Sequence, residues 1–519
     1  MARVASTPEL DGLALAPPAR RIARVPTPAL AVAVVCAAWA VAVVGGATGY
    51  IGALEDHADW LALAAPVATG LLVLLSRPHS PLWAKVALGA TVTVAVAVEV
   101  VPELDTTNVI ALIPVTLAVS AAIASRWPVV PVFVIFFLSG TFGTIEAYLP
   151  FFSAGVASDV LLAGGWSMLL WGWLTGRRET PRWLPLPLVP LLAYLGVTAL
   201  YVVFSTTLMQ SAYSFRASAW LMLGAVLVAL LLTDERHQDR AHKAMLLVGA
   251  VVGGYALLRW GIGPSAKEEE IARLGGPWVL GDNNEVRLFG SLPNPVALGV
   301  WSAAMLPLAF ASALSPMGAG WRLLGLVIMG LCGVALAGAD SRAAMVGAAA
   351  GSATVLVLFA VGRGFEGRRA LPLALGTIVL LLGGGVFAAT KLADEGKAGQ
   401  RFEGLLNPLS DYSVQDRLNK WKTVLDDVDE LPFGHGLGAS GIAEEKYARF
   451  TSAATFDPDS AYVKVAYDQG AMVMLLFIAA LIALAAGLGQ RAIRAPDARS
   501  GTLALAACGT LVSFSAAIG

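Results

Sequence analysis

The sequence predicts an all-α protein, a polytopic bundle of about 13–15 transmembrane helices with a partly helical large extracellular loop. Apolar residues make up 57% of the 519 residues, and charged residues only 14%, against about 25% in a soluble domain. The mean hydropathy is +0.72. A water-facing surface for a chain of this length needs more charge than this. The composition therefore excludes the soluble globular, disordered and coiled-coil classes.

Apolar runs long enough to cross a bilayer recur along the whole chain. A spanning helix needs about 20 mainly apolar residues. Candidate spans lie near 29–50, 60–75, 82–101, 109–124, 128–149, 155–174, 185–205, 217–233, 244–262, 295–314, 322–339, 343–362, 370–390, 461–488 and 501–519. The first run follows several arginines but is too long for the apolar region of a signal peptide. We therefore expect it to be an uncleaved first helix.

Basic residues give the orientation, because Lys and Arg near helix ends stay on the cytoplasmic side. Alternate connections hold basic clusters, the largest of them at 20–24, 177–182, 236–243, 363–369 and 491–499. The opposite short loops hold only Arg216 and Arg342. The pattern predicts a multi-pass protein of the cytoplasmic (inner) membrane with its N-terminus inside. The totals, 35 Lys plus Arg and 36 Asp plus Glu, give no indication of a nucleic-acid partner.

Two long segments interrupt the tight connections, and both are predicted to face the exterior, where long loops usually carry function. The chain then divides into a cytoplasmic tail 1–28, N-terminal transmembrane helices 29–262, a first extracellular loop 263–294, central transmembrane helices 295–390, a large extracellular loop 391–460 and C-terminal transmembrane helices 461–519. The last span stops at Gly519 without a polar tail, which favours a truncated chain.

Two arginines in exterior connections are candidates for binding an anion. Arg216 directly precedes a span, where the charge rule disfavours a cation; the alternative is an interfacial arginine that snorkels beside aromatic side chains. Arg287 lies in a turn made rigid by Gly290, Pro293 and Pro295. A guanidinium held by such a turn is suited to bidentate bonds with phosphate oxygens.

The large loop contains a predicted amphipathic helix, 413–430, which opens with the capping box Ser413 to Asp416. Arg417 is the one charged residue inside the apolar arc of this helix. Because an inward-pointing charge is costly unless paired, we favour a role in the site over a structural salt bridge.

Three further segments carry groups that could act in catalysis or support it. His435 could serve as a base, although a histidine between glycines is more often a solvated turn residue. Asp459 is predicted to open the helix that carries Tyr462, either as an N-cap or as a general base at the membrane surface. Asp340 and Arg342 form a short exterior turn, where an ion pair that supports the site is favoured over direct chemistry.

In this order the segments resemble the O-antigen ligase and polymerase superfamily of integral-membrane glycosyltransferases. The resemblance covers roughly 210–480 and rests on four motifs: Arg287-Leu-Phe-Gly-Ser-Leu-Pro-Asn294-Pro295; Asp340-Ser341-Arg342; Asp416-Arg417-Leu-Asn-Lys-Trp421 with Pro432-Phe-Gly-His-Gly-Leu-Gly438; and Asp459-Ser-Ala-Tyr462 with Asp468-Gln-Gly470. The family often has His-Asn-x-Tyr where this chain has Asp459-Ser-Ala-Tyr462. This difference makes a carboxylate the candidate base.

The resemblance implies a GT-C-like fold and a glycan donor carried on a polyprenyl diphosphate. The family places paired arginines against the diphosphate, and Arg216 and Arg287 are expected to take those positions. The residue patterns and the resemblance together predict catalytic roles for Asp459, Arg417 and His435, and substrate-binding roles for Arg216, Arg287, Asn294, Arg342 and Tyr462. The acceptor would be a glycan or a lipid, with membrane lipids around the protein and no nucleic acid. Attack opposite the leaving diphosphate would invert the configuration, and arginines would replace a metal, so we expect no cofactor.

Three alternatives stay open at this point. Within the family, a polymerase that extends a surface polysaccharide is favoured over a ligase that passes the glycan to a lipid or protein. Outside it, a polysaccharide flippase or other transporter has the same composition, but should place charges along its spans. A structural membrane protein would not need Arg417 on an apolar face.

Overall fold

The computed structural model describes residues 127–148, 154–174, 176, 185–205, 207–274, 286–362, 412–427, 431–441, 443–444, 456, 458, 460–495 and 498–518. Every element in these ranges is a helix, which confirms the predicted all-α class. The spans predicted before residue 127 and near 370–390 lie outside the described residues.

Sixteen helical elements follow one another in the described ranges. They are α5 (Val129–Tyr148), α6 (Ala154–Leu174), η2 (Leu186–Leu188), α7 (Val189–Val203), α8 (Leu208–Phe215), η3 (Arg216–Trp220), α9 (Met222–Leu231), α10 (Glu235–Ile262), α11 (Ala266–Leu274), α12 (Pro295–Leu314), α13 (Ala319–Ala339), α14 (Arg342–Gly362), α17 (Tyr412–Asp427), α19 (Ala461–Gln469), α20 (Ala471–Arg494) and α21 (Ala498–Ala517).

Seven helices in the described residues are long and apolar enough to cross a membrane. They are η2 with α7, then α10, α12, α13, α14, α20 and α21. The segment from α8 to α9 forms an eighth candidate span, bent by 44° after Trp220. The protein is thus a polytopic membrane protein, as its composition predicts.

Helix α12 forms the centre of the bundle and is the most buried of the candidate spans. It contacts α13, α14 and α21. Pro307 lies inside this helix and has no N–H to donate to the carbonyl of Ala303. The hydroxyl of Ser513 in α21 donates to that carbonyl instead, at 2.6 Å. A side chain of a neighbouring helix therefore satisfies the backbone where the proline interrupts α12.

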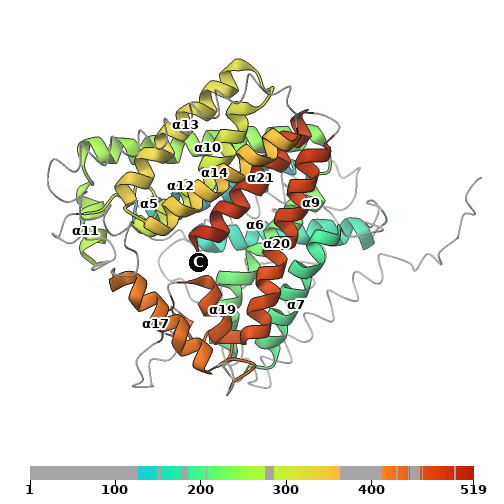
Figure 1. Ribbon diagram of the computed structural model, residues 1–519, viewed down its shortest axis with the longest axis vertical. Coiled ribbons are helices and arrows are strands. Elements are labelled where there is room, and N and C mark those ends of the chain that lie inside the picture. The colour runs from blue at the N-terminus through green and yellow to red at the C-terminus, as the bar shows by residue number, and fades with distance from the viewer. Residues whose placement is uncertain are drawn as a thin grey trace, which may run out of the picture.

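Small residues let α14 and α21 approach each other closely. A Cβ added at Gly351 would lie 2.5 Å from the carbonyl oxygen of Gly509. Only glycine fits at such a crossing, which is typical of helix pairs in membranes. Figure 1 shows α14 and α21 running alongside each other, with α20 next to α21 and α7 next to α20.

One predicted span changes. The predicted span 461–488 is broken at Gly470, so the short helix α19 precedes the spanning helix α20. Within the first long loop, Glu268 of α11 is buried. Its carboxylate pairs with Arg259 at 2.9 Å and accepts a hydrogen bond from Tyr255 at 2.7 Å. This network fixes α11 to the end of α10.

Candidate functional site

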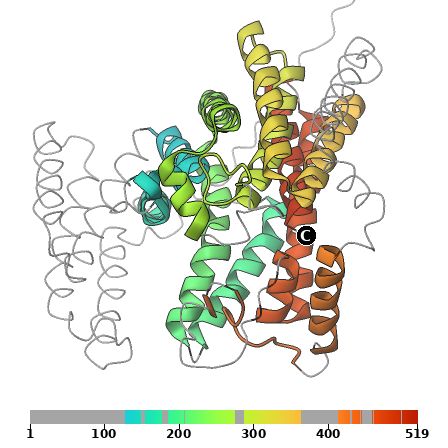
Figure 2. The same cartoon turned by 90° about the vertical axis from the view of Figure 1, so that its left-hand side faces the viewer.

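The end of α21 meets the beginning of α19, as Figures 1 and 2 both show beside the C-terminus. The backbone N–H of Ala461 donates to the carbonyl of Ile518 at 3.0 Å. The hydroxyl of Tyr462 donates to the carbonyl of Ser515 at 2.8 Å. Ser460 is buried and caps α19 by accepting from the N–H of Val463. The cap is therefore Ser460, and Asp459 precedes the helix rather than capping it.

The turn between α13 and α14 lies at this same end of the bundle. A Cβ added at Gly347, in the second turn of α14, would lie 2.8 Å from the side chain of Ala517. Asp340 ends α13 in the left-handed conformation, with φ 52°. One guanidinium nitrogen of Arg287 donates to the carbonyls of Ala339, at 2.6 Å, and Asp340, at 2.8 Å. We call this region, 287, 339–342, 460–462 and 515–518, the helix-end junction.

The glycine-rich segment 432–441 is a loop pressed between α8 and α19. The N–H groups of His435 and Gly436 donate to the carbonyls of Tyr467 and Asp468, each at 2.9 Å. On the other side, the hydroxyl of Ser211 in α8 donates to the carbonyl of Leu437 at 2.8 Å. Gly434 has φ 68°, and a Cβ there would lie 2.6 Å from the backbone N of Gly470. Glycine is thus required by both conformation and space.

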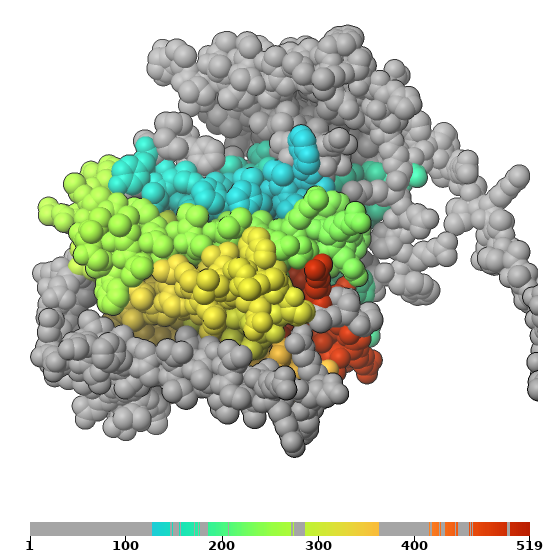
Figure 3. All heavy atoms as spheres, turned by 90° about the horizontal axis from the view of Figure 1, so that it is seen from above, coloured from blue at the N-terminus to red at the C-terminus, as the bar shows by residue number. Residues whose placement is uncertain are grey.

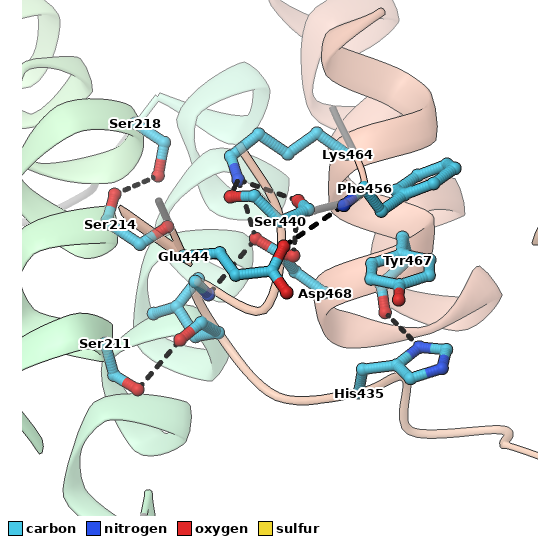
Figure 4. A network of polar contacts seen from close by, with 12 residues as sticks. Ser211, Ser214, Ser218, His435, Ser440, Glu444, Phe456, Lys464, Tyr467 and Asp468 are labelled. Carbon is cyan, nitrogen blue, oxygen red and sulfur yellow. Dashed lines mark hydrogen bonds and ion pairs between the residues drawn. The ribbon is translucent and has the colours of Figure 1, made fainter. Parts of the chain in front are cut away.

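A buried carboxylate ties this loop to α19, as Figure 4 shows. Asp468 is 1% exposed. It accepts hydrogen bonds from the hydroxyl of Ser440 at 2.7 Å, the ammonium of Lys464 at 2.9 Å and the N–H of Gly438 at 3.1 Å. Burial raises the pKa of Asp468 above its ordinary value, and the Lys464 ammonium opposes that shift. We call Asp468, Lys464, Ser440 and Gly438 the α19 network.

An aromatic stack and a second carboxylate border the α19 network. The ring of His435 stacks on Tyr467 with centroids 4.0 Å apart, and Phe456 stacks on Tyr467 at 4.3 Å. His435 is exposed, in agreement with a turn histidine. The carboxylate of Glu444 accepts from the N–H of Phe456 at 3.2 Å. Burial raises the pKa of Glu444 above its ordinary value.

Helix α17 packs against α19. It spans Tyr412–Asp427, so Ser413 lies in its first turn instead of at the N-cap. Trp421 and Val424 pack with Val463 of α19, but the apolar Leu418 is 51% exposed, so part of the predicted apolar face is directed at α19. Position 417 lies one helical turn before Trp421, on the same face. The side chain of Arg417 and all of Asp459 lie outside the described residues.

Two other predicted residues make contacts within the fold. Arg216 forms an ion pair with Asp159 of α6. It stands at the end of α8, whose Ser214 and Gln210 lie against Gly438 of the loop. Asn294 caps α12, because its side chain accepts from the N–H of Ala297 at 2.8 Å. In the described ranges no group of three His, Cys, Asp or Glu side chains could hold a metal ion.

Some of the predicted site residues lie near one another in the structure, and other polar residues lie beside them. Arg287, Arg342 and Tyr462 belong to elements that meet at the helix-end junction. His435 borders the α19 network. No member of this network was a predicted site residue, although Gly438 and Asp468 belong to the quoted motifs. A signal was present, since Lys464 and Asp468 are four residues apart and form an ion pair on one helix.

The family comparison covers most of these elements. Residues 324–478 match the family model described as O-antigen ligase, which confirms the resemblance to the O-antigen ligase and polymerase superfamily. The match begins in α13 and ends in α20, so it includes the 340–342 turn, the glycine-rich loop and α19. No curated protein and no solved structure matches the chain. The match supports a membrane protein that processes glycans.

Proposed function

We propose that this protein is an inverting glycosyltransferase that uses a polyprenyl-diphosphate-linked glycan on the outer face of the cytoplasmic membrane. The helix-end junction carries the proposal. It joins the turn held by Arg287, the end of α21 and the start of α19, which lie far apart in the sequence. Three of the four family motifs are thereby represented at one end of the helix bundle.

In the proposed reaction a hydroxyl of the acceptor sugar attacks the anomeric carbon of the donor. The C–O bond to the diphosphate breaks as the new glycosidic bond forms, and Asp459 takes the hydroxyl proton. The two residues after Asp459 support this assignment, because Ser460 caps α19 and the N–H of Ala461 donates to the carbonyl of Ile518. A positioned base typically contributes 10²–10⁴-fold in rate.

The leaving diphosphate gains negative charge, and in the proposal Arg216, Arg287 and Arg417 stabilise it. Removing one such donor typically costs on the order of 10²–10³ in rate. Arg287 also donates to the carbonyls of 339 and 340, so it would orient the turn that begins with Asp340 and leads to Arg342. In the proposal, Asn294 and Tyr462 support the sugar-binding region, and His435 lies at its edge.

We favour a polymerase, which extends a surface polysaccharide, over a ligase, which passes the finished glycan to a lipid or protein. The two differ in their acceptor and therefore in what accumulates when activity is lost. A polymerase defect leaves single units on the lipid carrier, whereas a ligase defect leaves long chains on it. In a flippase defect, the single units would stay on the cytoplasmic side, out of reach of an added glycosidase.

The test replaces Asp459→Asn, Arg287→Gln and Arg417→Gln one at a time in cells that make the polysaccharide. Asp457→Asn is the matched control for Asp459 and Lys422→Gln for Arg417, because each lies close by in the sequence. We expect the three site variants to accumulate lipid-linked single units at normal membrane levels of protein, while the controls make full-length chains. Normal glycan patterns in all three site variants would end the proposal.

A further inference from the structure

A second polar region lies at the end of α12, α13 and α21 that is opposite the helix-end junction. It is a cavity of about 360 Å³ between the start of α10, the α12–α13 connection and the start of α21. Figure 3 looks onto the end of the molecule where these three segments meet. The volume is within the usual range of about 300–1,000 Å³ for small-molecule sites.

Cations from two helices line this cavity. Arg236 and Arg240 come from α10 and Arg499 from α21, and all three are exposed. Glu235 and Asp239 also line it, but the Asp239 carboxylate already bonds Lys243 at 2.6 Å. Three guanidinium groups thus face two carboxylates, one of which is neutralised by a lysine. The rim therefore favours an anion.

Polar side chains form the floor of the cavity. Ser315, Thr502 and His242 line it and are each buried, with exposures of 2%, 6% and 4%. His242 is bonded to Ser312 through Nε2 at 2.6 Å. A polar floor under a cationic rim suits a compact, hydrogen-bonding anionic group, not an alkyl chain.

The place of the cavity in the fold identifies the source of the anion. Helices α12, α13 and α21 contain 20, 21 and 20 residues, which corresponds to about 30 Å, a bilayer core. Their opposite ends reach the helix-end junction. Arg322, Arg491 and Arg494 also lie on the cavity side, and this excess of cations marks the cytoplasmic face. A basic pocket between spanning helices on that face is typical of lipid headgroup sites.

We propose that this cavity binds the phosphate-bearing headgroup of an anionic phospholipid of the cytoplasmic leaflet. The guanidinium groups of Arg236, Arg240 and Arg499 bind the phosphate oxygens, and Ser315 and Thr502 lie beneath the polar head. The acyl chains remain in the bilayer beside α10 and α21. This site is separate from the proposed transfer reaction, so each proposal can fail without the other.

The experiment measures lipid retention by the full-length protein, purified in detergent and stripped of lipid. Phosphatidylglycerol, phosphatidylcholine and inorganic phosphate are added separately, and binding is followed by native mass spectrometry and melting temperature. The test variant is Arg236→Gln/Arg499→Gln. The matched control is Arg491→Gln/Arg494→Gln, which removes two cations from the same face outside the cavity. Arg236→Lys/Arg499→Lys keeps the charge and checks that the positions tolerate change.

We expect phosphatidylglycerol to bind the wild type and the control alike, and to raise their melting temperatures more than phosphatidylcholine does. The test variant should bind it at least about tenfold more weakly, and the lysine variant should recover most of the loss. Equal binding by the test variant and the wild type would overturn the proposal. So would an equal loss in the control, or stabilisation by inorganic phosphate without any by phosphatidylglycerol.

Discussion

Asp468 is the residue on which the loop, α19 and the start of α20 depend. Its carboxylate is almost fully buried and has three donors from two segments, namely Lys464 in α19 and Gly438 and Ser440 in the loop. A buried charge is tolerated only when its partners are complete. The same ion-pair spacing occurs at the surface in Lys243 and Asp239, where both side chains are partly exposed. The two pairs differ mainly in the carboxylate, because Asp468 is 1% exposed and Asp239 28%, whereas the two lysines are 29% and 32% exposed.

This contrast predicts different costs for the same change. Asp468→Asn should lower the free energy of unfolding by about 2 kcal/mol, because the amide nitrogen would lie among buried donors that need an acceptor, from Ser440, Gly438 and Lys464. Asp239→Asn should cost less than about 1 kcal/mol, because water reaches both members of that pair. Denaturant titration of both full-length variants in detergent checks the difference. Equal costs would show that burial does not set the strength of the Asp468 pair.

The glycine-rich loop is the element that joins α8 to α19, and its glycines serve different purposes. Gly434 and Gly436 both have positive φ, 68° and 104°. A Cβ at Gly434 would meet backbone atoms of Gly470 and Tyr467, both 2.6 Å away, whereas a Cβ at Gly436 would meet nothing within 4 Å. Of these two glycines, Gly434 is the one at which conformation and space act together.

The two alanine substitutions should therefore separate the two effects. Gly436→Ala should cost about 1 kcal/mol from left-handed strain alone and leave the polysaccharide nearly unchanged. Gly434→Ala should also push the loop away from α19, displace His435 from Tyr467 and shorten or abolish the polysaccharide. Product gels and unfolding titrations on both variants test this. If Gly436→Ala were the more damaging change, close packing would not be the reason for Gly434.

At the scale of the whole molecule, the long helices α12, α13 and α21 separate two chemically different ends. One end has the family motifs and the helix-end junction. The other end has a group of arginines near helix ends, namely Arg236, Arg240, Arg322, Arg491, Arg494 and Arg499. Because cations are retained on the cytoplasmic side, the motifs are expected outside.

Cysteine labelling tests this orientation directly. In a chain with Cys36, Cys332 and Cys508 replaced by alanine, Phe433→Cys and Arg491→Cys each add one exposed thiol, since Phe433 and Arg491 are both exposed. A membrane-impermeant maleimide should label position 433 in intact cells and position 491 only after permeabilisation. The reverse pattern would place the glycine-rich loop in the cytoplasm and exclude the proposed outer-face reaction.

Apolar runs in the sequence located those helices whose position depends on local composition. The run 295–314 coincides with α12, because an apolar stretch of this length satisfies its backbone groups in lipid by forming a helix. Pro295 begins this helix, and Ser315 follows its last residue. The prediction was wrong for 461–488, which Gly470 divides, because hydropathy does not register a positive φ of 88°. Hydropathy gives no indication of the burial of Glu268 either, because its partners Arg259 and Tyr255 belong to the preceding helix.

The sequence by itself determined the membrane class, the helical form and the family motifs, because these follow from composition, local period and short residue patterns. Only the tertiary structure decided which distant residues bond to one another. Arg287 donates to the turn at 339–340, the carbonyl of Ile518 accepts from the first residue of α19, and Asp468 accepts from the glycine-rich loop. These contacts join residues from 28 to more than 50 positions apart. Such pairings are set by how the helices pack against one another, and no local pattern encodes that packing.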